Sequence, residues 1–169
     1  QDFCLVENST CLANVLPACL PDMGFFPAVF GIYGKKRRAE ALKFLDRVGL
    51  LEKSEEPVKN LSGGQKQRAA VARALITTPQ LILADEPMSA IDVAARVRIL
   101  EAFRAIRAAN PSMSLVMVSH DLGVVQHIAD RIVVLHDGRV EESGTTTEIL
   151  KHPCSAYTRS LIEAASMQA

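Results

Sequence analysis

The sequence predicts an α/β fold with a parallel sheet, because its second half alternates short apolar runs with helical stretches. This pattern begins near residues 77–79; the preceding part is helical and loop-like. Two apolar runs end in polar residues, as expected of buried parallel strands whose carboxyl ends carry a ligand site. The 169 residues are enough for about one domain with a buried core.

Composition and charge argue against several classes. Lys plus Arg and Asp plus Glu each number 19, so the zero net charge does not favour nucleic acid as a partner. The most apolar segment, residues 24–33, contains Pro27 and is shorter than the ~20 residues of a membrane-spanning helix. The cysteines form no CxxC pair, and a zinc site at His152 and Cys154 lacks further ligands. Because the first residue is Gln1 and not Met, we expect a truncated or partial sequence.

The first predicted helix follows the basic run at residues 35–38. It carries an apolar stripe at Ala39, Leu42, Leu45 and Val48, and Gly49 can end it in a left-handed conformation. The four basic residues could bind phosphate, but a solvated helix face is the more common explanation.

A second helix begins within residues 61–68, which read LSGGQKQR. Ser62 and Gln65 fit a capping box, and the two glycines leave backbone N–H groups open to an anion. An ordinary capped helix is the alternative, since S-x-x-Q alone is frequent.

A strand is predicted at residues 81–84, ending in Asp85 and Glu86, and another at residues 114–119, ending in His120. Between them, residues 91–109 form a crossover helix with apolar positions Ala94, Val97, Leu100 and Ile106.

The Asp-Gly pair at residues 137–138 predicts a hairpin over residues 131–141, and residues 155–167 read as a terminal helix.

The full LSGGQ string with its downstream Gln and Arg resembles the signature of ABC transporter ATPases. The resemblance extends along nearly the whole chain and implies a partial P-loop NTPase (RecA-like) parallel sheet with an α-helical subdomain. It implies that residues 1–76 form the helical subdomain, from Q-loop to signature helix. Residues 77–169 would then form the C-terminal half of the RecA-like core with a helical tail.

The same resemblance implies the roles of individual residues. At the end of the Walker B strand, Asp85 would hold Mg²⁺ through water and Glu86 would polarise the attacking water. His120 resembles the switch histidine at the γ-phosphate, and Gln1 resembles the Q-loop glutamine that contacts Mg²⁺ and water. The alternative for Asp85 and Glu86 is a polar end of the strand. The alternative for His120 is a surface histidine.

Contacts to ATP and to a second subunit are implied for two further segments. The signature residues Ser62, Gly63, Gly64 and Gln65 would close over ATP held by a partner. Residues 88–92 resemble the D-loop, with Ile91 in place of Leu, and would put Ser89 and Asp92 at the dimer interface. Asp92 can also cap the following helix, and both interpretations can hold together.

The phosphate-binding Walker A string, G-x-x-x-x-G-K-[ST], does not occur in the 169 residues. Gly31, Gly34 and Lys35 have the wrong spacing and no following Ser or Thr. The aromatic loop that stacks on adenine in the family is also absent, so we expect ATP binding by this chain in cis to be weak or nil.

The resemblance therefore implies an ATPase that uses ATP and Mg²⁺ to drive solute import. Its partners would be a second nucleotide-binding domain, permease subunits and a solute-binding protein, at the cytoplasmic face of the membrane. Residues 14–33 resemble phosphonate importers, and the tail at residues 152–162 resembles peptide and nickel importers. The apolar surface at residues 12–33 would receive the permease, although local core is an equal alternative.

Two alternatives stay open. One is a non-catalytic partial subunit that supplies LSGGQ to a partner's ATP site. The other is a soluble ABC protein acting on DNA or the ribosome, which zero net charge and the lack of a coiled-coil insertion argue against.

Overall fold

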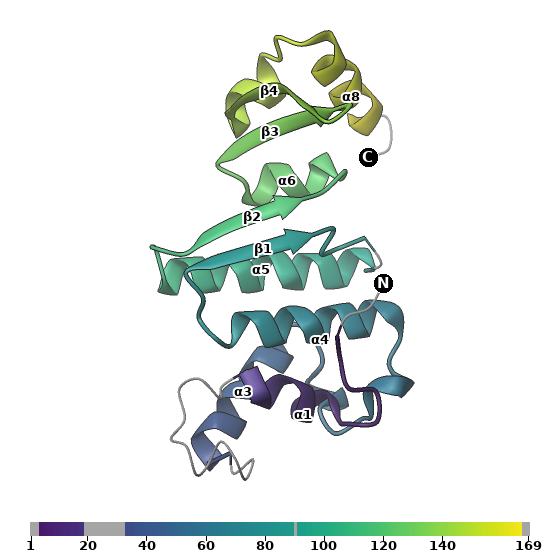
Figure 1. The fold of residues 1–169 in the computed structure, drawn as a ribbon, viewed down its shortest axis with the longest axis vertical. Coiled ribbons are helices and arrows are strands. Elements are labelled where there is room, and N and C mark those ends of the chain that lie inside the picture. Colours follow the sequence, from purple (N-terminus) through teal and green to yellow (C-terminus); the bar gives the residue numbers. More distant parts are fainter. Residues whose placement is uncertain (1–3, 19–32, 90, 167–169) are drawn as a thin grey trace. The chain divides into compact units, whose positions relative to one another are not determined.

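The computed structural model describes residues 4–18, 33–89 and 91–166, and it divides into two compact units, residues 1–117 and 118–169 (Figure 1). The division into residues 1–76 and 77–169 rests on the family's subdomains and not on contacts within the chain, and it stays a prediction. Gln1 and most of the apolar segment at residues 12–33 lie outside the described residues.

The first unit contains four α-helices among its described residues: α1 (Cys11–Val15), α3 (Lys35–Arg47), α4 (Gly63–Leu75) and α5 (Val93–Ala109). Two short 3-10 turns, Leu51–Lys53 and Val58–Asn60, connect α3 to α4. Helix α3 packs against α1, α4 and α5, so the core of this unit lies among helices.

Helix α3 ends as the sequence predicts. Gly49 adopts a left-handed φ of +68°. Its N–H donates to the Asp46 carbonyl at 2.8 Å, and the Leu50 N–H donates to Leu45 at 2.7 Å. The predicted stripe is only partly right: Leu45 and Val48 are buried, but Ala39 is exposed. Because α3 contacts α1, α4 and α5, its buried face also includes Ala41 and Phe44.

Helix α5 begins at Val93, two residues after the predicted start, because Asp92 caps it through a 2.9 Å bond from the Ala95 N–H. Its predicted buried face is wrong at Ala94 and Val97, which are exposed. The buried face consists of Ala95, Ile99, Leu100, Ala102, Phe103 and Ile106. Twelve of the 17 residues of α5 are apolar, so the spacing of apolar residues did not determine which face of the helix is buried.

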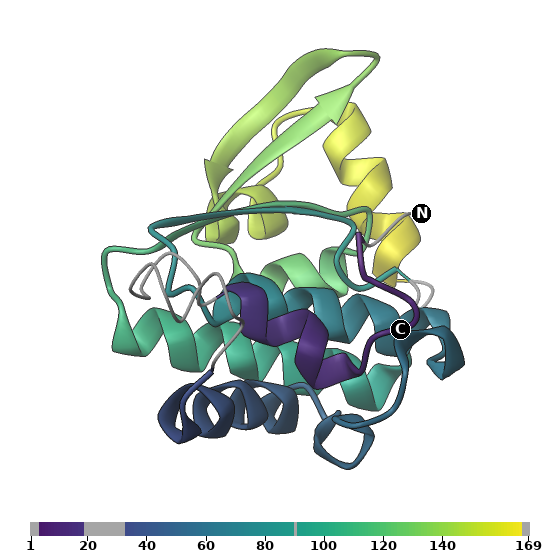
Figure 2. The same cartoon turned by 60° about the horizontal axis from the view of Figure 1, so that its bottom comes forward.

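Strands β1 (Leu81–Asp85) and β2 (Ser114–Val118) form a two-stranded sheet, and their arrows point the same way in Figure 1. The predicted parallel pair and crossover helix are therefore confirmed. Figure 2 shows helices α4 and α5 on one side of this sheet.

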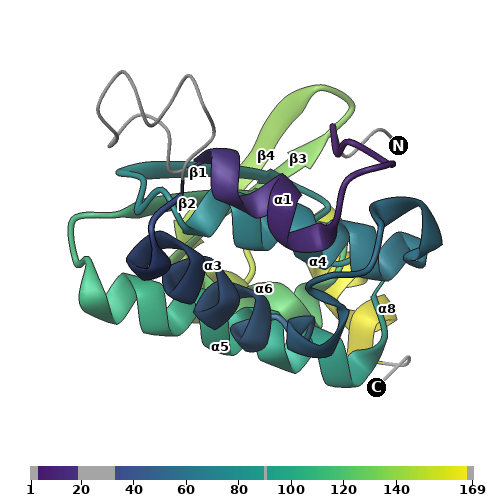
Figure 3. The same cartoon turned by 90° about the horizontal axis from the view of Figure 1, so that it is seen from below.

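The expected burial of these strands is confirmed on one face only. Ile82 is 7% exposed, whereas Leu83 is 74% exposed. The view from below in Figure 3 also shows α4 and α5 on one side of the sheet. Alternate side chains on the other face therefore meet solvent.

The second unit contains α6 (Leu122–Ile128), β3 (Arg131–His136), β4 (Arg139–Thr145), α7 (Thr146–Lys151) and α8 (Ala156–Ser166). Strands β3 and β4 pair antiparallel around Asp137 and Gly138, whose φ angles are +47° and +73°. These angles match a tight hairpin turn and confirm the prediction from Asp-Gly. The core of this unit consists of Ile132, Val134 and Ile149, with Val125, Ala129, Leu150, Tyr157 and Leu161 packed against them.

Glu142 on β4 holds the start of α8. Its carboxylate accepts the Cys154 N–H at 2.8 Å and the Ser155 N–H at 3.1 Å. The backbone hydrogen bond from Cys154 is the main reason that the pKa of Glu142 lies below its ordinary value.

Within the described ranges, no helix has both the length and the apolar character needed to cross a membrane.

Candidate nucleotide-binding site

The signature residues form the start of α4. The Ser62 Oγ accepts the Gln65 N–H at 3.3 Å, and the Gln65 Oε1 accepts the Ser62 N–H at 2.9 Å, which confirms the predicted capping box. No atom lies within 4 Å of a Cβ built on Gly63, so the first turn is open to a ligand. The first turn of α4 carries no acidic side chain, and its N–H groups and dipole therefore favour an anion.

Asp85 is the last residue of β1 and is exposed, and Glu86 follows it in a left-handed conformation with φ of +45°. A glutamate rarely adopts this conformation without support from its surroundings. The chain then turns back, because the Ser89 N–H donates to the Glu86 carbonyl at 3.3 Å. The Ser89 Oγ donates to the same carbonyl at 3.1 Å.

The structure brings the signature helix and this turn together through Gln67. The Gln67 Nε2 donates to the Glu86 carbonyl at 2.8 Å, and the Gln67 side chain is buried. In the sequence, Gln67 is recognisable only as part of the LSGGQKQR string. The position of Gln67, two residues after Gln65, places it in the signature helix. Neither its burial nor its hydrogen bond to Glu86 could be predicted from the sequence.

Arg68 is a second residue whose role the sequence did not reveal. Its Nη1 donates to the Val48 carbonyl at 3.1 Å, at the C-terminal end of α3. Together with the cap at Gly49, this bond fixes the end of α3 against α4.

Of the D-loop residues, Asp92 is shown to cap α5, and Ser89 is exposed in the turn after Glu86. Ile91, which replaces the leucine of the family pattern, is buried. An interface role for Ser89 and Asp92 stays a prediction.

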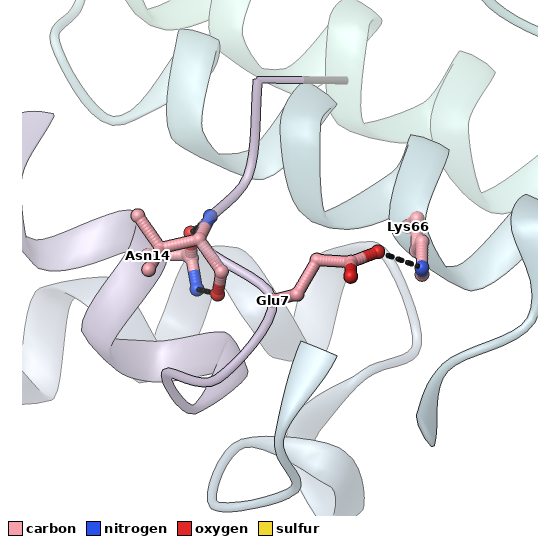
Figure 4. Close-up of polar contacts among 4 residues, drawn as sticks. Glu7, Asn14 and Lys66 are labelled. Carbon is pink, nitrogen blue, oxygen red and sulfur yellow. Dashed lines mark hydrogen bonds and ion pairs between the residues drawn. The ribbon is translucent and has the colours of Figure 1, made fainter. Parts of the chain in front are cut away.

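The segment that follows the predicted Q-loop is attached to α4. Figure 4 shows the Glu7 carboxylate pointing to Lys66, with 3.0 Å between Oε1 and Nζ. The Arg73 Nη1 donates to the Cys4 carbonyl at 2.7 Å. Asn14 on α1 holds the same segment, because its Nδ2 donates to the Val6 carbonyl at 3.0 Å. The N-terminal segment therefore contacts α4 near both ends of the helix.

His120 belongs to the second unit, where it follows β2 and is exposed. The next residue, Asp121, caps α6 by accepting the Val124 N–H at 3.2 Å. The Ser119 Oγ accepts the Asp121 N–H at 3.1 Å. Local hydrogen bonds thus fix the backbone on the C-terminal side of His120.

The donor set after β1 suits a metal ion that arrives with a nucleotide. Its carboxylates belong to the adjacent residues Asp85 and Glu86. In the part of the chain that the structure describes, no three His, Cys, Asp or Glu residues form a group that could hold a metal ion. Mg²⁺ typically takes one or two carboxylates, with phosphate oxygens and water as its other ligands. The exposed carboxylate of Asp85 therefore fits Mg²⁺.

A capped Gly-Gly helix start, joined to the carboxylate-bearing turn after a parallel strand, is typical of α/β proteins that bind anionic ligands at the carboxyl ends of their strands. The sequence profile of the family "ABC transporter" matches residues 1–89. The chain therefore belongs to the ABC transporter ATP-binding family, which confirms the resemblance in the sequence.

Among its curated relatives is the "Dipeptide transport ATP-binding protein DppF" of Haemophilus influenzae, 40% identical over 131 residues, or 77% of this chain and 40% of the relative. The "Methionine import ATP-binding protein MetN 2" of Oenococcus oeni is 35% identical over 167 residues, or 98% of this chain and 44% of the relative. The chain thus spans about two fifths of these relatives, and both names fit the importer type.

A solved structure of the ATP-binding cassette MJ0796, described as a dimeric post-hydrolysis state bound to ADP and Pi, matches with a TM-score of 0.74 and 33% identity. The match covers 86% of this chain and 60% of that chain. A second structure of MJ0796, also described as dimeric, gives a TM-score of 0.72. The predicted fold, a partial P-loop NTPase sheet with a helical subdomain, is confirmed.

Proposed function

We propose that this chain is part of the ATP-hydrolysing subunit of an ABC transporter that couples ATP hydrolysis to solute import. The observation that carries the proposal is the bond between Gln67 of the signature helix and Glu86 of the strand-end turn. It joins the signature helix to the turn that carries the Asp85 and Glu86 carboxylates, and carboxylates at the end of a parallel strand are the groups that bind Mg²⁺ and orient water in phosphoryl transfer from ATP.

In this proposal, Glu86 orients and polarises the attacking water, and Asp85 binds Mg²⁺, which neutralises charge on the phosphates when it is bound. His120 and Gln1 complete the catalytic set, and Gln1 also contributes to the metal site. The exposed position of Asp85 and the open N-terminus of α4 support these roles.

The signature would act on ATP held by a second nucleotide-binding domain, through Ser62, Gly63, Gly64 and Gln65. Ser89 and Asp92 would lie at the interface between the two domains. The dimers described for MJ0796 support such a pairing. Helices α1, α3 and α4, which pack together, support a helical subdomain within residues 1–76 and a core within residues 77–169.

Permease subunits and a solute-binding protein would complete the transporter, with this chain peripheral at the cytoplasmic face of the membrane. The names of the peptide and methionine import relatives support uptake of small peptides or amino acids. A non-catalytic subunit that lends its signature to a partner is the second candidate. Its support is the LSGGQ string at residues 61–65 with its open first helical turn.

The test is ATP hydrolysis by this chain alone, and by a version extended upstream through any Walker A sequence that its gene encodes. We expect hydrolysis only in the extended version. Glu86→Gln should lower its kcat by about 100-fold or more, because it removes a general-base contribution. The control is Glu101→Gln, the same chemical change at an exposed position on α5, which should leave kcat unchanged.

Robust hydrolysis by the short chain would show that it needs no upstream phosphate-binding loop. Full activity of the extended Glu86→Gln variant would exclude the proposed role of Glu86. The second candidate is supported if the short chain restores hydrolysis to a partner whose own signature has been inactivated.

A further inference from the structure

The side chain of Gln67 is a buried amide that makes one hydrogen bond to another described residue. Its side chain is 6% exposed, and its Nε2 donates to the Glu86 carbonyl at 2.8 Å. Its Oε1 accepts no hydrogen bond from any described residue. A buried acceptor without a partner weakens the fold relative to an apolar side chain of the same length. Core packing therefore does not explain an amide at this position.

The carbonyl that Gln67 contacts does not depend on it for hydrogen bonding. The Ser89 N–H and the Ser89 Oγ both donate to the same Glu86 oxygen, at 3.3 and 3.1 Å. Loss of the Gln67 donor would not leave this carbonyl unpaired. The bond from Gln67 therefore contributes mainly to the orientation of the peptide plane after Glu86.

That orientation matters because Glu86 has a φ of +45°. The left-handed conformation is unfavourable for a glutamate and persists only where neighbouring groups hold it. The peptide plane after Glu86 sets its ψ angle, and φ and ψ together set the direction of the side chain. Gln67, 19 residues earlier in the chain, donates to this plane from outside the turn.

We propose that Gln67 is a positioning residue: its amide holds the turn after β1 so that the Glu86 carboxylate points to the attacking water. This role rests on the function proposed above. It also gives the signature a direct link to the turn, because Gln67 lies one helical turn after Gly63 and Gly64 on α4. A displacement of the start of α4 would therefore reach the main chain of Glu86 through one hydrogen bond.

The test uses Gln67→Met in the extended, ATP-hydrolysing protein. Met has the same length and removes both the donor and the unpaired acceptor. We expect kcat to fall about 10- to 100-fold, as for a small misplacement of a reacting group. The KM for ATP should stay within about twofold, since Gln67 touches no nucleotide in this proposal. The urea midpoint of unfolding should not fall. Gln80→Met, the same change at an exposed position before β1, is the control.

Two further measurements separate positioning from a general effect on folding. In a Glu86→Gln background, Gln67→Met should lower kcat by less than about twofold, because the group it positions is already gone. Amide hydrogen exchange in the peptide covering residues 85–92 should be faster in Gln67→Met than in the wild type. Gln67→Leu serves as a second variant if the Met variant does not fold.

A kcat within twofold of wild type in Gln67→Met, or unchanged exchange at residues 85–92, would overturn the positioning role and leave the proposed function intact. A full further loss of kcat in the Glu86→Gln background would overturn it as well. If Glu86→Gln itself retains full activity, the proposed role of Glu86 fails, and the catalytic consequence of Gln67 fails with it.

Discussion

Replacement of Gly49 by Ala tests how the end of α3 is held. Gly49 has a φ of +68°, a conformation that costs an L-residue about 1 to 2 kcal/mol. A Cβ on Gly49 would lie 2.6 Å from the Arg98 Nη1 and 3.2 Å from the Arg68 Nη1. Arg98 can move, but Arg68 donates to the Val48 carbonyl at 3.1 Å, and loss of that bond would cost about 1 kcal/mol.

The sum predicts a loss of about 2 to 3 kcal/mol in the free energy of unfolding for Gly49→Ala. This corresponds to a decrease in Tm of roughly 4 to 12 °C for a chain of this size. Urea unfolding followed by circular dichroism measures the first quantity, and a thermal scan measures the second.

Two companion variants separate the causes. Gly49→Asn adds the same Cβ but tolerates the left-handed conformation, so it should lose less than Gly49→Ala if backbone strain dominates. Equal losses would assign the cost to contact with the arginines. Gly63→Ala, where nothing lies within 4 Å, should be neutral or stabilising by up to about 1 kcal/mol. A Gly49→Ala variant as stable as the wild type would refute the reasoning.

Three further predictions concern burial and charge. In this chain, Ile82→Ala should lower the free energy of unfolding by about 2 to 5 kcal/mol, because Ile82 is buried. Leu83→Ala, on the open face of the sheet, should lower it by under about 1 kcal/mol. Urea unfolding measures both values. Burial raises the pKa of the Cys11 thiol to about 11, so at pH 8 it should react with a disulfide reagent roughly 100-fold more slowly than the exposed Cys4. The pKa of Glu142 is lower in the folded state than its ordinary value of 4.5. The ionised carboxylate therefore stabilises the fold fully above pH 4.5, and this stabilisation is lost as the pH falls through the folded-state pKa. Glu142→Gln should therefore be less stable than wild type at pH 7, and the difference should shrink in acid; a constant difference would contradict this assignment.

The sequence by itself determined the features that depend on a few neighbouring residues. The capping box at Ser62 and Gln65, the left-handed stop at Gly49 and the Asp137–Gly138 hairpin each follow from local backbone and side-chain chemistry, and the structure confirms all three. The LSGGQ string identified the family for the same reason, since its residues are consecutive. The catalytic, metal-binding and interface roles carried over from that resemblance stay predictions.

The tertiary structure decided which faces are buried and which distant groups meet. Helix α5 is apolar around much of its circumference, so only its contacts show that Ile99 is buried and Val97 exposed. The sheet strands are apolar on both faces, and the placement of the helices leaves Leu83 in solvent. The bond from Gln67 to Glu86 joins residues 19 positions apart, and the left-handed φ of Glu86 has no local signature. Both depend on the packing of α4 beside the end of β1, which no pattern of neighbouring residues encodes.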